Sequence, residues 1–339
     1  MYQFEIKDNE AGQRFDKYLH KLLPKAPTSF FYKMLRKKNI VLNGKKAEGK
    51  EKLSVGDTVS LFLSEETFQG FLGNADTSIY LEAYKRFKNI TVLYENEHML
   101  LVSKPSGVLS QKAKDTDYSV NEWLIGYLLD KHVIDAASLS TYKPSVCNRL
   151  DRNTSGIVLC AKTLAGSQEL SHMIATRKIR KYYRLFVKGI INKEVTLDGF
   201  LIKDHDKNYV SIISSDDIDS NCENASYIKT RYYPINILSE LSYVEVELIT
   251  GKTHQIRAHM ASIGHPLLGD YKYGDKIFND KYQDKYKIKS QLLHAYRLEF
   301  PQNALLTPDG AMTFTADEPA IFRHLLSIKN NTSHRAKDT

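Results

Sequence analysis

The chain has 339 residues, of which 42% are apolar and 26% are charged, a composition typical of a soluble globular protein with about two domains. No apolar run approaches the roughly 20 residues that cross a bilayer, and the N-terminus lacks the basic and then apolar pattern of a secretory signal, so we expect a cytoplasmic protein. The three cysteines, Cys147, Cys160 and Cys222, share no close spacing and suggest neither a disulfide framework nor a zinc site.

The net charge of +8 is concentrated near the N-terminus. Residues 1–64 hold 13 Lys and Arg against 7 Asp and Glu, whereas the remainder is nearly balanced, with 35 against 33. A basic excess in a small segment is the electrostatic signature of a protein that binds a polyanion, although a solvated lysine-rich surface gives the same count.

Two short amphipathic helices are expected near the N-terminus. The apolar side chains of residues 15–22 are spaced for one helical face, and the pattern stops near Pro24. A second helix is expected to begin at Thr28 or Ser29, either of which could cap it, and to bury the apolar side chains of residues 31–35.

Basic residues stand at the end of the second helix. Cations there can complement the helix dipole or contact phosphate, and both interpretations stay open. These cations are Arg36, Lys37 and Lys38. Short strands are then expected at 40–42 and 58–63, the first followed by the tight-turn pair Asn43-Gly44. Together these elements predict one small module over residues 1–64.

A second, larger domain is expected over residues 87–329. Residues 65–86 show no sustained periodicity and are expected to form the linker, and residues 330–339 are expected to be a disordered tail. The second domain opens with two strands joined by a turn, within residues 90–102, and these lead to Lys104, which we expect to be solvated or to contact phosphate.

One stretch of the second domain carries a candidate nucleophile. In residues 148–156, Asp151 stands between two arginines, and an apolar strand follows at 157–161. A nearby guanidinium favours the charged form of a carboxylate, which is the form that attacks as a nucleophile. These residues alone also allow Asp151 to cap the turn and pair on the surface with Arg149 or Arg152.

Further along, a helix capped by Thr163 precedes a strand at 182–189, in which Tyr183 faces with the apolar side chains. Residues 192–224 are polar and are expected to form hairpins and loops. Residues 276–290 hold five lysines interleaved with Tyr282 and Tyr286, which predicts a basic loop that contacts a polyanion or is solvated.

A strand at 243–248 leads through a turn into a helix whose buried stripe runs through Ile256. Arg257 lies off that stripe, where its guanidinium could meet a carboxylate at a neighbouring strand or contact phosphate. His254 and His259 are five residues apart, roughly 140° around a helix, so they do not share a face as a zinc-binding pair would.

Several of these segments together resemble the RluA-type RNA pseudouridine synthases. The matches are residues 148–156, the Lys-x-Tyr at Lys181 and Tyr183, and residues 250–274. Two positions depart from the usual family pattern, with asparagine in place of histidine at 148 and lysine in place of arginine at 252. Residues 1–64 resemble the alpha-L RNA-binding motif, which occurs at the N-terminus of many such synthases.

The resemblance implies an α+β fold with a large mixed, mainly antiparallel sheet. It also implies an isomerase that converts uridine in RNA to pseudouridine without a cofactor. By this resemblance Asp151 is the essential aspartate, Arg257 pairs with it and Tyr183 stacks on the target base; whether Asp151 attacks ribose C1' or uracil C6 stays open. RNA contacts are expected from Arg149, Arg152, Lys181, Lys252, His254, Arg36, Lys37 and Lys38.

We expect the substrate to be structured RNA, with large-subunit ribosomal RNA the first choice and tRNA the alternative. A non-catalytic RNA-binding factor would need only the basic module and would leave pseudouridine unchanged on gene deletion. A retaining glycosidase or nucleosidase would need a second carboxylate about 5 Å from Asp151, which none of the matched motifs offers. No metal, redox or nucleotide motif is present, and we expect no membrane association and no obligate protein partner.

Overall fold

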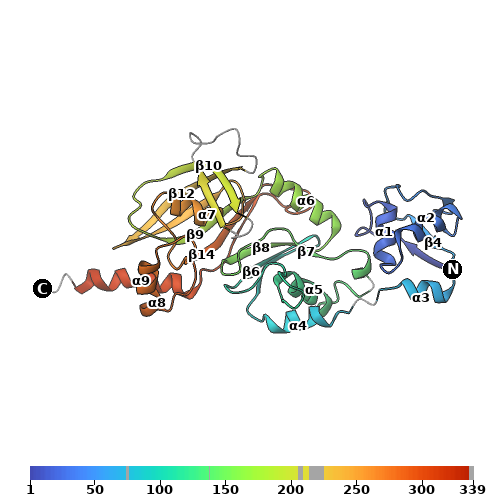
Figure 1. Cartoon of the computed structure of the whole chain (residues 1–339), viewed down its shortest axis with the longest axis horizontal. Helices are drawn as coiled ribbons and strands as arrows, with labels where there is room; N and C mark the ends of the chain where they lie inside the picture. Colours follow the sequence, from blue (N-terminus) through green and yellow to red (C-terminus); the bar gives the residue numbers. More distant parts are fainter. Residues whose placement is uncertain (74–75, 137, 205–208, 214–224, 336–339) are drawn as a thin grey trace.

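The computed structural model describes residues 1–339 except 74–75, 137, 205–208, 214–224 and 336–339. A small N-terminal module lies at one end of an elongated molecule, and the C-terminal helix α9 (Ala320–Arg335) lies at the other (Figure 1). Among the described residues, no helix is long and apolar enough to span a membrane.

The N-terminal module is a four-stranded antiparallel sheet covered by two helices. Its strands follow the order β1 (Tyr2–Glu5), β4 (Thr58–Leu61), β2 (Ile40–Leu42) and β3 (Lys45–Lys46). The helices are α1 (Phe15–Leu22) and α2 (Thr28–Arg36), and their apolar faces are buried as the periodicity predicts. The N-cap of α2 is Pro27, without a side-chain hydrogen bond, so the expected cap at Thr28 or Ser29 is wrong.

Residues 65–86 are not the irregular linker that their composition predicts. They form α3 (Glu65–Phe71) and α4 (Ser78–Arg86), and each packs on a different module. In α3, Phe68 stacks on Tyr2 with ring centroids 3.7 Å apart. Helix α4 lies so close to α5 (Val120–Asp130) that a Cβ on Gly126 would come within 2.0 Å of the Tyr80 carbonyl oxygen. The connection between the modules is therefore the short segment between α3 and α4.

The larger module is built on an 11-stranded mixed sheet, in which one described pair, β8 and β14, is parallel and the others are antiparallel. This confirms the expected α+β class and mainly antiparallel sheet. The main path is β11-β10-β12-β13-β9-β14-β8-β6-β5, with β15 added to β14 and β7 to β8. The strand bounds are β5 (Thr91–Glu95), β6 (Met99–Lys104), β7 (Ser145–Val146), β8 (Ser155–Ala161), β9 (Arg180–Lys188), β10 (Val195–Asp204), β11 (Tyr209–Ile213), β12 (Ser226–Leu238), β13 (Leu241–Leu248), β14 (Leu293–Phe300) and β15 (Met312–Thr315).

Helices of the larger module confirm one expectation and correct two. Thr163 caps α6 (Leu164–Ala175), since its hydroxyl accepts the N–H of Gly166 at 3.0 Å. The expected basic loop at 276–290 is instead largely a helix, α8 (Lys276–Tyr286), whose buried face includes Phe278. Residues 330–335 of the expected disordered tail belong to α9, and residues 336–339 lie outside the described part. The remaining helices are α7 (Gln255–Ser262) and the short 3-10 helix η1 (Ser138–Ser140).

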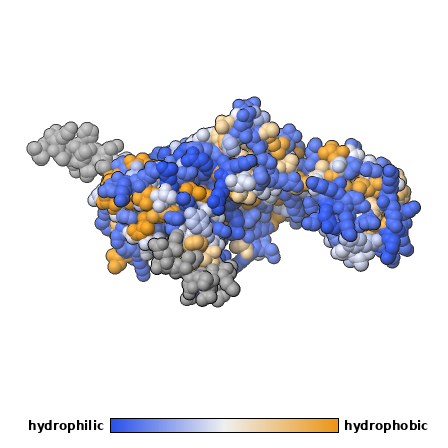
Figure 2. Space-filling model, turned by 90° about the horizontal axis from the view of Figure 1, so that it is seen from above, coloured by the Kyte–Doolittle hydropathy of each residue, from blue (hydrophilic) through white to orange (hydrophobic). Residues whose placement is uncertain are grey.

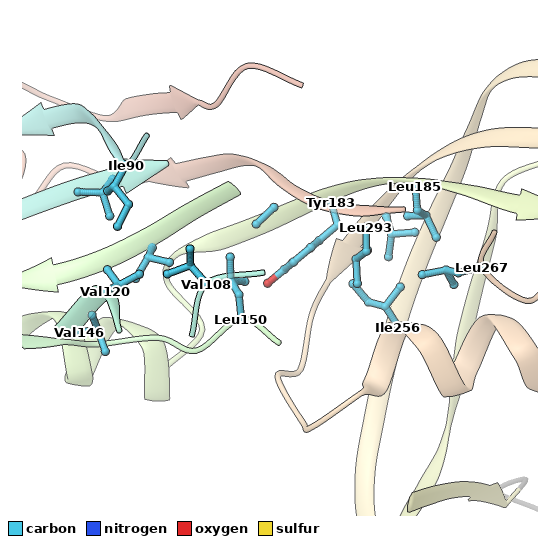
Figure 3. Close-up of a cluster of buried hydrophobic side chains, with 14 of the residues drawn as sticks. Ile90, Val108, Val120, Val146, Leu150, Tyr183, Leu185, Ile256, Leu267 and Leu293 are labelled. Carbon is cyan, nitrogen blue, oxygen red and sulfur yellow. The ribbon is translucent and has the colours of Figure 1, made fainter. Parts of the chain in front are cut away.

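The centre of the sheet has apolar side chains on both faces. Along β9, Tyr183, Leu185 and Val187 join the main buried cluster, whereas Phe186 packs with side chains of α8 and α9. Within the main cluster, the Tyr183 ring lies with its hydroxyl oxygen directed toward Leu150 (Figure 3). The expected alternation of β9 is confirmed, and it places Tyr183 next to the segment that carries Asp151.

The small module forms a separate lobe whose visible surface is mostly hydrophilic (Figure 2). Described hydrogen bonds across the junction include the Thr141 hydroxyl to a Glu10 carboxylate oxygen, 2.8 Å, and the Leu164 N–H to the Asn9 side-chain oxygen, 3.4 Å. Both are polar contacts at the edge of the module.

Candidate active site

The turn that carries Asp151 is held by the loop at residues 105–110, which follows β6. Inside the turn, the Thr154 N–H donates to the Asp151 carbonyl oxygen at 3.0 Å. From the loop, the Gly107 N–H donates to the Arg152 carbonyl oxygen at 2.9 Å. The position of Asp151 is therefore fixed by two segments that are about 40 residues apart in sequence.

From the interior, Lys104 hydrogen-bonds both the 105–110 loop and the turn that carries Asp151. Its side chain is 0% exposed, and its ammonium donates to the carbonyl oxygens of Pro105, Val108 and Arg152 at 3.1, 2.7 and 2.9 Å. Burial lowers the pKa of Lys104 to about 7, while the charge of Asp151 acts in the opposite direction. The expectation that Lys104 is solvated or contacts phosphate is therefore wrong, because its buried ammonium binds three backbone carbonyl oxygens of the protein.

Strand β8 leaves the turn along a path that only glycine permits. Gly156 has φ 110°, and a Cβ there would lie 2.2 Å from the Ala295 carbonyl oxygen of β14. Before the turn, the Asn148 side-chain oxygen accepts the Leu159 N–H of β8 at 2.8 Å. Asn148, at the position where the family usually has histidine, therefore holds the chain against β8.

Asp151 and Arg257 meet across 106 residues of sequence. Arg257 Nη1 donates to Asp151 Oδ2 at 2.9 Å, and the rest of the guanidinium binds Asp270, with Nε to Oδ2 at 2.7 Å and Nη2 to Oδ1 at 2.9 Å. The side chains of Arg257 and Asp270 are 9% and 0% exposed, whereas that of Asp151 is 28% exposed. One buried guanidinium thus links a fully buried carboxylate to a solvent-accessible one.

The buried member of this group is charged. Burial by itself raises the pKa of Asp270, but the hydrogen bonds and charge of Arg257, with the backbone N–H groups of Lys272 and Tyr273, bring it below its ordinary value. Because Asp270 binds two of the three guanidinium nitrogens, Nε and Nη2, in a planar pairing, the third nitrogen, Nη1, is directed at Asp151. Arg257 is therefore oriented from the interior and does not project into solvent as a phosphate contact would.

His254 also lies beside Asp151, where the chain enters α7. Its Nε2 is 3.8 Å from Asp151 Oδ2, and its Nδ1 is 2.9 Å from the Tyr273 hydroxyl oxygen. The Tyr273 ring in turn lies 5.1 Å from the guanidinium carbon of Arg257. His254 had been expected to contact RNA, and the structure places it inside the carboxylate cluster.

Tyr183 is buried next to this cluster. It is 8% exposed, and its pKa is raised, first by burial and then by the charge of Asp151. The three residues expected to be catalytic, Asp151, Arg257 and Tyr183, therefore come together. The surface pairing of Asp151 with Arg149 or Arg152 is absent from the described ion pairs, in which the partner of Asp151 is Arg257 or His254.

The residues expected to contact RNA form two groups. Arg149, Arg152 and Lys252 are exposed around the Asp151 cluster, and Lys181 lies against the turn before α7, its Nζ 3.4 Å from where a Cβ on Gly251 would stand. The second group is exposed on the N-terminal module, at the end of α2. It consists of Arg36, Lys37 and Lys38. Among the described residues no group of three or more His, Cys, Asp and Glu is arranged to hold a metal ion.

Comparison with known proteins gives consistent relatives. Residues 98–262 match the family described as RNA pseudouridylate synthase. An uncharacterized RNA pseudouridine synthase homologue of Mycoplasma pneumoniae is 30% identical over 306 residues, with 88% of each chain covered. The ribosomal large subunit pseudouridine synthase C of Vibrio cholerae is 27% identical over 297 residues, with 87% of each covered.

Solved structures share the fold. Human RNA pseudouridylate synthase domain containing 4 superposes with a TM-score of 0.59 at 20% identity, over 73% of this chain and 95% of that chain. This likeness concerns the fold, whereas the family is shown by the relatives above. The chain belongs to the RluA-type RNA pseudouridine synthase family and is an isomerase that converts uridine in RNA to pseudouridine.

Sequence reasoning missed two members of the site, Asp270 and Tyr273. Both fall inside the matched stretch 250–274, but nothing in their spacing from Arg257 indicates contact, since they follow α7 in an irregular segment. The signal available in the sequence was the glycine–aspartate pair Gly269-Asp270, since glycine before an acidic residue is typical of a turn; the structure gives Gly269 φ 80°.

Proposed function

We propose that Asp151 is the nucleophile of this pseudouridine synthase and that Oδ1 is its attacking atom. The observation that carries the proposal is the shared guanidinium of Arg257, which binds Oδ2 of Asp151 at 2.9 Å. Among the described residues, no hydrogen bond involves Oδ1, and the side chain keeps 28% of its surface exposed. A charged, oriented and accessible oxygen is what nucleophilic attack requires.

The reaction breaks the bond between uracil N1 and ribose C1', turns the base, and joins C5 to C1'. The proton on C5 leaves and N1 gains one, so the product is an isomer and nothing is oxidised or reduced. Asp151 attacks either C1' or C6 and is released as a carboxylate at the end. The target base must first leave its stack, at a cost of a few kcal/mol, and the proposal assigns its reception to the accessible part of Tyr183.

Asp270 supports Asp151 through Arg257 and takes no part as an acid. A retaining glycosidase needs a second, protonated carboxyl group close to the nucleophile. Asp270 and Asp151 bind the same guanidinium, that of Arg257. The side chain of Asp270, however, is 0% exposed, and its pKa lies below the ordinary value. It therefore has no proton to donate to a leaving base, which supports isomerisation over release of free uracil.

Large-subunit ribosomal RNA is the substrate we propose. The relatives of Vibrio cholerae and Haemophilus influenzae are named for the ribosomal large subunit, and the similarity covers 87–88% of this chain. Exposed cations around Asp151 and at the end of α2 would contact the RNA backbone on both modules, because phosphate contacts supply most of the affinity for structured RNA. The basic N-terminal module would then hold the RNA while the target loop enters the site.

Pseudouridine mapping of total RNA from cells with and without the gene tests this proposal. We expect loss of pseudouridine at discrete positions of large-subunit ribosomal RNA, restored by the wild-type gene and not by Asp151→Asn. Loss of pseudouridine confined to tRNA would show that tRNA is the substrate. Restoration of pseudouridine by Asp151→Asn would show that Asp151 is not the nucleophile.

A further inference from the structure

The ring of His254 is held from two sides at the entrance to α7. Nδ1 lies 2.9 Å from the Tyr273 hydroxyl oxygen and Nε2 lies 3.8 Å from Asp151 Oδ2, with 10% of the side chain exposed. The backbone of His254 has φ 54°, in the left-handed region that a residue other than glycine occupies at some energetic cost. With this backbone conformation the imidazole ring lies next to Asp151. The isomerisation described above assigns no role to His254.

The contacts of Tyr273 favour one of the two neutral tautomers of His254. The Tyr273 oxygen accepts the Val210 N–H of β11 at 3.1 Å. Burial raises the pKa of Tyr273 to about 12, so its hydroxyl keeps its proton at neutral pH. Among the described residues, the acceptor within reach of that proton is His254 Nδ1. A neutral ring that accepts at Nδ1 carries its own proton on Nε2, the atom facing Asp151.

The surroundings keep this ring neutral. The pKa of His254 is lowered, first by burial, while the charges of Arg257 and Lys272 act in the same direction and those of Asp151 and Asp270 oppose them. A neutral donor orients a carboxylate without cancelling its charge, as an imidazolium would. The nucleophilic character of Asp151 is therefore preserved.

We propose that His254 is a positioning residue for Asp151, whose neutral imidazole donates Nε2–H to Oδ2 when RNA occupies the site, with Tyr273 fixing the tautomer. The inference rests on the proposed role of Asp151 as the nucleophile. The present separation exceeds an ordinary N–H···O bond by about 0.9 Å, and such bonds commonly shorten when substrate binds. Together with Arg257, this second donor to Oδ2 fixes the carboxylate plane and leaves Oδ1 for attack.

Two matched variants of the full chain test the donor. His254→Asn suits the left-handed backbone, and its short amide reaches Tyr273 but not Asp151; His254→Gln places an amide N–H near the position of Nε2. We expect the single-turnover rate at saturating RNA to fall about tenfold to hundredfold in His254→Asn and to return to within about threefold of wild type in His254→Gln. RNA affinity should be unchanged in both, whereas an RNA-contact role predicts weaker binding at a normal saturating rate and would overturn the proposal.

Long-range ¹H–¹⁵N NMR of the wild-type imidazole provides a readout that does not depend on turnover or on the folding of either variant. We expect an unprotonated Nδ1 and a protonated Nε2 at pH 7, and a mixture of tautomers in Tyr273→Phe. A protonated Nδ1 or an imidazolium in the wild type at pH 7 would overturn the proposal. Failure of the proposed function is distinguishable, because Asp151→Asn would then retain activity while the tautomer of His254 stayed as described.

Discussion

Replacing Arg257 with lysine keeps the charge at the centre of the site and removes its geometry. The guanidinium donates three hydrogen bonds, one to Asp151 and two to Asp270, from atoms in one plane. A lysine ammonium is a single point of donation on a flexible stem and cannot span both carboxylates in this way. Because Asp270 is fully buried, we expect the ammonium to stay with it and the contact with Asp151 to be lost.

The size of the effect follows from that one lost contact. A hydrogen bond to a charged group contributes about 1.5–3 kcal/mol, which corresponds to a roughly 10- to 150-fold lower rate. Single-turnover rates at saturating RNA should fall by this factor in Arg257→Lys, with an RNA affinity close to that of the wild type. The exposed Arg323 of α9 offers a matched control, since Arg323→Lys makes the same substitution far from the site and should leave both quantities unchanged. A normal saturating rate with weakened binding in Arg257→Lys would refute this reasoning and show a phosphate-binding arginine instead.

Three further outcomes are expected. Asp270→Asn should lower the free energy of unfolding by about 3–5 kcal/mol in urea titrations, because it removes the fully buried carboxylate of Arg257 and leaves the partly exposed Asp151 as its counter-charge; an unchanged midpoint would contradict the pairing. Burial lowers the pKa of Lys104 from 10.5 to about 7, so between these pH values the unfolded chain binds one proton more than the folded chain. The free energy of unfolding of the wild type should therefore rise with pH across this window relative to that of Lys104→Met. If the free energies of unfolding of the two proteins depend on pH in the same way, Lys104 has no lowered pKa. Removing residues 1–72, the N-terminal module with α3, should flatten the salt dependence of RNA binding by about 0.7–0.9 in slope per lost phosphate contact, and an unaltered slope would show that the module does not touch the backbone.

Periodic segments were predictable because the spacing of their apolar residues matches the period of a helix or of a strand. The apolar stripe at residues 15–22 specifies a helix and its buried side, and the alternation at residues 182–189 specifies a strand and the side chains that share a face with Tyr183; both are confirmed, although β9 also buries Phe186 on its other face. The helices α3 and α8 were missed because each is anchored by few buried side chains, Phe68 in α3 and mainly Phe278 and Tyr282 in α8, within polar sequence. Each begins at a residue whose side chain caps the helix, Ser64 in α3 and Asp275 in α8, but such a cap by itself does not predict a helix, and tertiary packing stabilises both.

At the site, the sequence and its family resemblance predicted that Asp151, Arg257 and Tyr183 lie together. The structure added the side chains around them, among which are Asp270 and Lys104. No spacing rule joins Asp270 to Arg257, since an irregular segment separates them and the pairing depends on how the chain turns back after α7. The burial of Lys104 was equally hidden. Its three carbonyl partners come from two loops, and a lysine at a strand end is ordinarily solvated.

The most direct test of the central claim is the amount of pseudouridine formed in vitro by the wild-type protein and by Asp151→Asn. Deproteinised large-subunit ribosomal RNA from cells lacking the gene serves as substrate, and thermal unfolding and RNA affinity confirm that the variant is folded and binds. An amide keeps the shape of the side chain and loses the nucleophile, so the wild type should form pseudouridine at discrete positions and Asp151→Asn should form none. Activity of Asp151→Asn within about tenfold of the wild type would contradict the assignment of Asp151 as the nucleophile.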